Sequence, residues 1–163
     1  MRAYFFGNYY LSSIQQGIQA LHCIVEMGHK YKFLSIPQTK MLDTWGVIHK
    51  TVVLLNGGNQ QSLIDLLAFF VGQDNPYPFG SFREDEQSLN EALTCVGIIL
   101  PEKIYEGSAL LRDRRTMIQH LEPTDLFDNH NKVLVPVGDN SCPHVYTEWE
   151  ITLMQKLNEY RLA

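Results

Sequence analysis

The segment Leu93-Thr94-Cys95-Val96-Gly97-Ile98-Ile99-Leu100 contains no charged residue, and half of its side chains are β-branched. Such a run is typical of a strand that is buried on both faces of a sheet. The uncharged run Thr51–Leu55 has the same character, and the aromatic segment Arg2–Tyr10 is expected to open the fold as a strand. Phe79–Glu84 follows two prolines, which suits a fourth strand at a sheet edge.

Helical patterns separate these strands. After a cap at Leu11–Ser13, a helix is predicted to run to about His29, and its isoleucine, leucine and valine side chains form one apolar face: Ile14, Ile18, Leu21 and Val25. Further helices are expected at Met41–His49, at Gln60–Val71 and after Pro101. Strands that alternate with helices indicate an α/β domain with a mixed sheet.

The chain is expected to divide into two parts. An α/β core domain covers residues 1–115, and a C-terminal extension covers residues 116–163, where the sequence becomes polar and loop-like. The pattern Thr147-x-x-Glu150 is a capping box, which predicts a final helix through Tyr160.

Charge and composition exclude some functions. The chain of 163 residues has 18 acidic and 13 basic side chains, so its net charge is -5, and a nucleic-acid partner is not expected. No apolar run reaches the ~18 residues that span a bilayer. The three cysteines are widely spaced and odd in number, which favours a reducing, cytoplasmic setting without disulfides.

Two short motifs resemble the peptidyl-tRNA hydrolase type 2 family. The family's A-Q-x-x-H segment corresponds to Ile18-Gln19-Ala20-Leu21-His22, and its T-V-L-G-I strand is similar to Thr94–Ile98. The resemblance covers residues 3–106. It implies a four-stranded mixed sheet flanked by helices, often in a dimer, and a lysine-bearing turn that, with an aspartate and a threonine, cleaves the ester of peptidyl-tRNA.

The sequence departs from the family at the catalytic positions. Where the resemblance implies lysines, this chain has Ser13 and Gln15, and the aspartate-bearing segment falls on Phe82–Glu86 out of register. A glutamine cannot supply the charge with which an ammonium group binds phosphate or polarises a carbonyl. We therefore expect binding rather than turnover, and no cofactor.

The candidate ligand-binding residues come from two regions. One is a polar stripe on the first helix, and the other is the charged loop after Phe79–Glu84, with flanking aromatic and polar residues. Amides, an imidazole and an Arg fork can bind a base, a ribose or a phosphate. The predicted set is Tyr10, Ser12, Ser13, Gln15, Gln19, His22, Trp45, Asn56, Arg83, Glu84, Asp85, Asn90 and Thr94. The alternative is that both regions are ordinary solvated surfaces.

Three other motifs favour structural roles. Asn56–Asn59 lacks the spacing of a phosphate-binding loop and fits a plain strand-to-helix turn, and Arg112–Arg115 fits a solvated helix end. The spacing of His120, His130, Cys142 and His144 matches no structural zinc pattern, so no metal is expected.

Our leading hypothesis is that the chain binds a nucleotide-like small molecule as a homodimer or larger assembly. In size it is similar to compact viral proteins, including those of phages, that sequester bacterial immune nucleotide signals. One alternative is a hydrolase of peptidyl-tRNA or a small phosphodiester, with His22, Glu84 and Asp85 as acid-base groups. The other is a protein-interaction module that uses its aromatic surface and final helix.

Overall fold

A computed structural model describes residues 1–34, 36–72, 74–117, 133–135 and 144–163. The chain forms two compact units. The first consists of Met1–Leu100 together with Tyr160–Ala163, and the second is Pro101–Glu159. The division into 1–115 and 116–163 stays a prediction.

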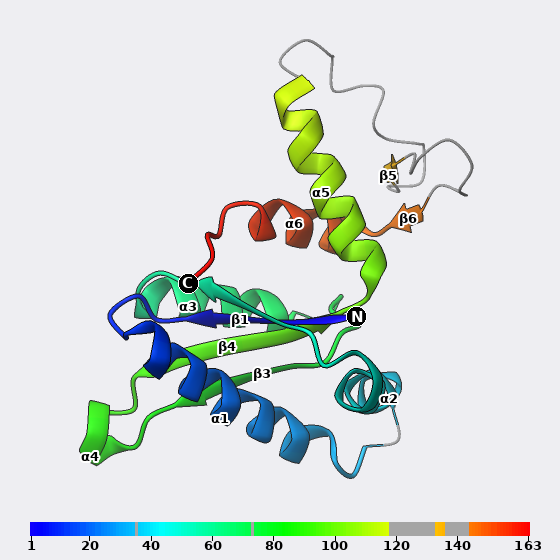
Figure 1. Cartoon of the computed structure of the whole chain (residues 1–163). Coiled ribbons are helices and arrows are strands. Elements are labelled where there is room, and N and C mark those ends of the chain that lie inside the picture. The colour runs from blue at the N-terminus through cyan, green and yellow to red at the C-terminus, as the bar shows by residue number, and fades with distance from the viewer. Residues whose placement is uncertain (35, 73, 118–132, 136–143) are drawn as a thin grey trace. The chain divides into compact units, whose positions relative to one another are not determined.

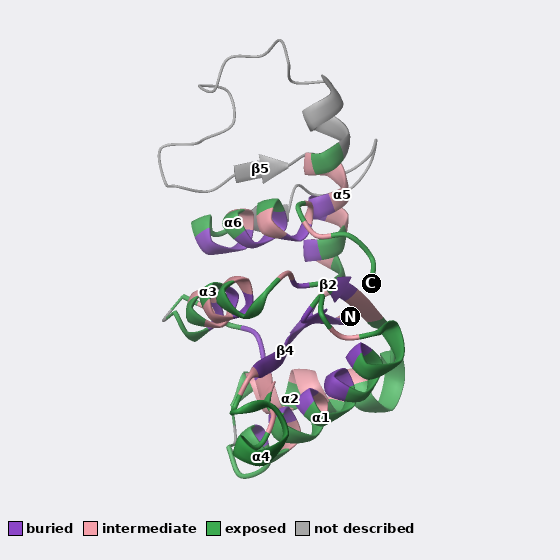
Figure 2. Cartoon of the chain, turned by 90° about the vertical axis from the view of Figure 1, so that its left-hand side faces the viewer, coloured by how far each residue is buried: buried purple, intermediate pink, exposed green. Residues whose placement is uncertain are grey.

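A four-stranded mixed sheet organises the first unit. Its strands are β1 (Arg2–Gly7), β2 (Val52–Asn56), β3 (Phe79–Arg83) and β4 (Leu93–Leu100), in the order β2-β1-β4-β3. β1 is parallel to β2 and antiparallel to β4, which is antiparallel to β3. The predicted α/β fold with a mixed sheet is confirmed, as is the edge position of β3. β4 is buried along its whole length, as Figure 2 shows.

Helices cover both faces of this sheet (Figure 1). α1 (Ser13–Tyr31) and α2 (Pro37–Thr44) lie on one face, and α3 (Gln60–Val71) lies on the other. A π-helical turn, η1 (Trp45–His49), follows α2, and the short helix α4 (Glu86–Leu89) joins β3 to β4. Successive side chains of β1 point to opposite faces of the sheet. Phe5 packs in the core cluster beneath α1, while the Phe6 ring lies 6.1 Å from the Phe70 ring of α3.

The packing face predicted for α1 is wrong. The predicted apolar residues are exposed, with Ile14 at 78% and Leu21 at 62%, and the helix instead buries another side: Gln16, Gln19, Ala20, Cys23, Met27 and Tyr31. The reason is close approach, because α1 runs over glycines of the sheet. A Cβ on Gly97 would lie 3.1 Å from the Cys23 sulfur. Small or flexible side chains such as Ala20, Cys23 and Met27 fit that distance, and a row of bulky branched aliphatic side chains does not.

β2 is an edge strand, which corrects the expectation that it is buried on both faces. Only Leu55 of β2 is fully buried. The end of the chain pairs with this edge: Asn56 N donates to Arg161 O at 2.9 Å, and Ala163 N donates to Leu54 O at 3.1 Å. The apolar run of β2 is explained by its pairing with the C-terminal residues as well as by its place in the sheet.

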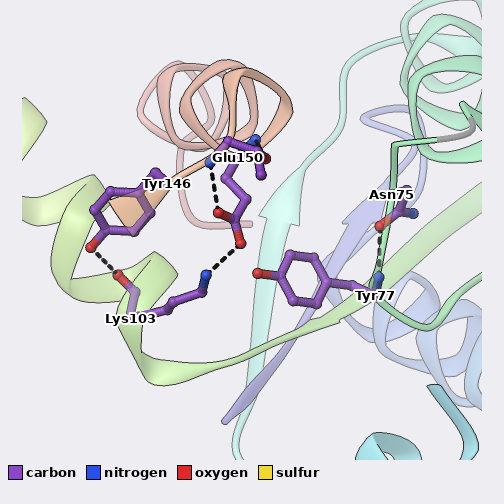
Figure 3. Close-up of polar contacts among 6 residues, drawn as sticks. Asn75, Tyr77, Lys103, Tyr146 and Glu150 are labelled. Atoms are coloured by element: carbon purple, nitrogen blue, oxygen red, sulfur yellow. Dashed lines mark hydrogen bonds and ion pairs between the residues drawn. The ribbon is translucent and has the colours of Figure 1, made fainter. Parts of the chain in front are cut away.

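The second unit is built on two helices, α5 (Glu102–Met117) and α6 (Glu148–Leu157), with the short strands β5 (Val133–Val135) and β6 (His144–Tyr146). The predicted capping box is present at Thr147 and Glu150, although α6 ends at Leu157 rather than Tyr160. The Tyr146 hydroxyl donates to Lys103 O at 2.9 Å, and the Lys103 ammonium lies 2.7 Å from a carboxylate oxygen of the buried Glu150. Both contacts are drawn in Figure 3.

Candidate functional site

Gln19 joins three elements of the first unit. Its side chain is 8% exposed, and its Nε2 donates to a Glu84 carboxylate oxygen at 2.6 Å. The hydroxyl of Thr94, on β4, lies 3.3 Å from Gln19 Oε1 and 3.4 Å from the carbonyl oxygen of Phe82. The amide is thus held at both ends, by a carboxylate that follows β3 and by a hydroxyl on β4.

An exposed imidazole lies beside this amide, one turn further along α1. The His22 ring stacks on the Phe82 ring, with 4.5 Å between centroids and 17° between planes. Together these residues present a flat π surface next to a carboxylate. We call Gln19, His22, Phe82, Glu84 and Thr94 the amide cluster.

Four residues of the predicted set therefore come together: Gln19, His22, Glu84 and Thr94. The prediction missed Phe82. Period-two alternation could have found it, because Phe82 and Glu84 lie two positions apart and so share a side of the chain.

The polar residues at the start of α1 are used by the helix itself. Ser12 is the N-cap, and its N–H donates to Gln15 Oε1 at 2.9 Å, which closes a capping box. Ser13 is the first helical residue. Tyr10 is 77% exposed, and its ring lies 4.0 Å from that of Tyr9.

The loop between β3 and β4 is also held by its own hydrogen bonds. Arg83 Nη1 donates to Glu91 O at 3.1 Å, and Asn90 has a positive φ of 50° at the end of α4. Asp85 caps α4, because its carboxylate accepts from Ser88 N at 2.6 Å. Hydrogen bonds from Ser88 lower the pKa of this exposed carboxyl, which therefore stays ionised near neutral pH.

Trp45 and Asn56 have hydrogen-bond partners outside the amide cluster. Trp45 Nε1 donates to Thr51 O at 2.9 Å, and the ring packs beside the core cluster of the α1 face. Asn56 Oδ1 accepts from Gly58 N at 3.0 Å within the turn that leads to α3. That turn is a capped strand-to-helix connection, since Asn59 accepts from Ser62 N.

Trp45 instead borders a cavity of about 390 Å³ between the end of α1, α2 and η1. Its side-chain walls combine aromatic, aliphatic and charged residues: Tyr31, Lys32, Leu42, Asp43, Trp45 and Val47. The sequence did not indicate this cavity, because a single acidic residue in a short helix, Asp43, matches no binding motif.

The described residues contain no candidate metal centre and no membrane-spanning helix. Among them, no group of three or more His, Cys, Asp and Glu side chains could hold a metal ion. The side chains of His120, His130, Cys142 and His144 lie outside that part, as do those of Arg114 and Arg115. No helix in the described ranges has the length and apolar character needed to cross a bilayer.

We compared the chain with models of known protein families and with curated protein sequences. No family model and no curated sequence matches it.

Proposed function

We propose that this chain is a non-catalytic binding protein with a scaffold like that of type 2 peptidyl-tRNA hydrolases, and that the amide cluster holds a nucleotide-like small molecule. The observation that carries the proposal is the contact between the two motifs of the resemblance. Gln19 belongs to the first motif and Thr94 to the second, and their side chains are 3.3 Å apart.

The chemistry of the amide cluster suits the nucleoside part of such a ligand. The stacked rings of His22 and Phe82 offer a π surface on which a base can lie. The Glu84 carboxylate is partly exposed and has oxygen lone pairs beyond the one that Gln19 uses, so it can accept ribose hydroxyls or an exocyclic amino group.

Binding is favoured over turnover because Gln15 and Asp85, which lie at or near the positions where the resemblance implies catalytic groups, have structural tasks. Gln15 closes the capping box at the position where the family resemblance implies a lysine. Asp85 caps α4, and its lowered pKa removes it as an acid near neutral pH. A protein that retains its ligand without cleaving it can sequester a nucleotide signal, and we propose that role, in the cytoplasm and of phage origin.

Self-association is part of this proposal. Ile14, Ile18, Leu21 and Val25 form an exposed apolar stripe along α1, at spacings of 4, 3 and 4 residues. Rows of exposed apolar side chains of this kind often mark interfaces. A two-fold axis through the stripe would place it against the same stripe of a second copy.

Native mass spectrometry of the full chain with a panel of nucleosides, nucleotides and cyclic nucleotides tests the binding function. We expect one class to be retained with its mass intact. Glu84→Ala should weaken that binding roughly 10- to 100-fold, the usual worth of a hydrogen bond to a charged group. Asp65→Asn, on the opposite face of the sheet, is the matched control and should bind normally.

Two outcomes would overturn the proposal. Release of a cleaved product, or hydrolysis of peptidyl-tRNA, would establish the hydrolase alternative. A lack of retained mass across the panel would remove the nucleotide-like ligand.

Light scattering after size exclusion tests self-association. Leu21→Glu should reduce the mass to that of a monomer. Val71→Glu, which changes an exposed residue of α3, should keep the wild-type mass. A monomeric wild type would refute the interface on α1.

A further inference from the structure

The cavity at the end of α1 is separate from the amide cluster and has the dimensions of a ligand site. Its volume of about 390 Å³ lies within the range of roughly 300–1,000 Å³ that small-molecule pockets occupy. It is bounded by residues of α1, of α2 and of the π-helical turn η1. π-Helical turns are rare and often lie at functional sites.

Two glycines keep this cavity open. Gly28 of α1 and Gly46 of η1 both line it, and a Cβ built on either residue meets no atom within 4 Å. Packing within the chain therefore does not require glycine at these positions, although glycine is a poor helix former. A side chain at either position would project into space beside the cavity, so glycine leaves that space open to a ligand.

Few polar groups in the cavity walls are free to form hydrogen bonds with a ligand. The Tyr31 hydroxyl accepts from Phe79 N at 3.2 Å, and Trp45 Nε1 donates to Thr51 O. The hydroxyl of Thr39, which also lines the cavity, is hydrogen-bonded to the backbone oxygen of Leu34. What remains exposed toward a ligand is aromatic and aliphatic surface.

The two charged residues that line the cavity, Lys32 and Asp43, differ in their contacts. The Lys32 ammonium lies over the ring of Phe33, 5.4 Å from its centroid, and Phe33 is not part of the wall. Lys32 borders the cavity, and its ammonium is engaged by the Phe33 ring. Asp43 has no hydrogen bond or ion pair with any residue in the described ranges. It lies in the last turn of α2, which continues directly into η1.

We propose that this cavity binds a small organic cation, with its apolar body against Trp45 and its ammonium group facing Asp43. An aromatic wall attracts a cation through its π face, and an unpaired carboxylate supplies the counter-charge. The inference is independent of the nucleotide-like ligand proposed above, because the two sites share no residue.

Fluorescence of Trp45 can report on occupancy of this cavity. Trp149→Phe removes the second tryptophan of the chain, and the full-length variant is then titrated with 2-phenylethylammonium and, separately, with the neutral alcohol 2-phenylethanol. We expect a saturable change in Trp45 emission, with the ammonium compound binding at least ~10-fold more tightly, as a charge-assisted contact implies.

Substitutions then test which residue gives the preference for the cation. Asp43→Asn, at an exposed position that should fold normally, is expected to abolish the preference for the cation, while Asp65→Asn should keep it. Gly28→Leu is expected to block both compounds, with far-UV circular dichroism as the check on folding. Equal affinity for the two compounds, an unchanged preference in Asp43→Asn, or no Trp45 response to either compound would overturn the proposal.

Discussion

Alanine substitutions at three glycines should change stability with opposite signs. Gly17 and Gly28 lie within α1, and a Cβ on either meets nothing within 4 Å. Alanine there should stabilise the chain by about 0.8–1.0 kcal/mol through helix propensity alone. At Gly97 a Cβ would lie 2.6 Å from the Phe5 ring, and such overpacking costs about 1–3 kcal/mol.

Thermal unfolding followed by circular dichroism, at low protein concentration, measures these differences. A change of 1 kcal/mol shifts the midpoint by about 2–4 °C in a chain of this size. We expect Gly17→Ala and Gly28→Ala to melt higher than the wild type and Gly97→Ala to melt lower. A destabilised Gly17→Ala would refute the open helix face, and a neutral Gly97→Ala would refute the close approach of Phe5.

Three further predictions concern capping and ionisation. Thr147→Ala should remove the side-chain cap of α6 and cost about 1 kcal/mol, seen as faster amide exchange in that helix. Burial, with the nearby carboxylates, raises the pKa of Tyr146 to about 12. Because the unfolded phenol ionises near its usual value of 10, stability should fall between pH 10 and 12, and Tyr146→Phe should flatten that decline. A hydrogen bond with Cys23 and burial raise the pKa of Cys95 well above its usual value, so peptide mapping should find Cys95 unmodified by thiol reagents until the protein unfolds.

The strands could be predicted because their signal is local. The uncharged run at β4 and the prolines before β3 specify a buried strand and an edge strand without reference to the rest of the chain. The position of β2 at the opposite edge could not be predicted, since its cover comes from residues more than 100 positions away. Apolar character alone does not tell which neighbour provides burial.

The orientation of α1 shows a different limit. Hydrophobic periodicity selects the most apolar side of a helix, and here that side is exposed. The buried side is determined by the short distance between the helix and the glycines of the sheet, and that distance is known only from the packed structure. Gln19 and Thr94 could be selected as site residues, but the contact of Gln19 with both Glu84 and Thr94 depends on the pairing of β3 with β4.

The pairing of Tyr160–Ala163 with β2 makes the second unit an insertion in the chain of the first. Both ends of Pro101–Glu159 connect to the same sheet-bearing body, so joining Leu100 to Tyr160 through a short linker would give a shortened chain that still contains every strand of the four-stranded sheet. Removing the last four residues would instead uncover the polar backbone groups of β2 and create a free edge that can pair with other chains. An affinity tag after Ala163 would be joined directly to this paired segment.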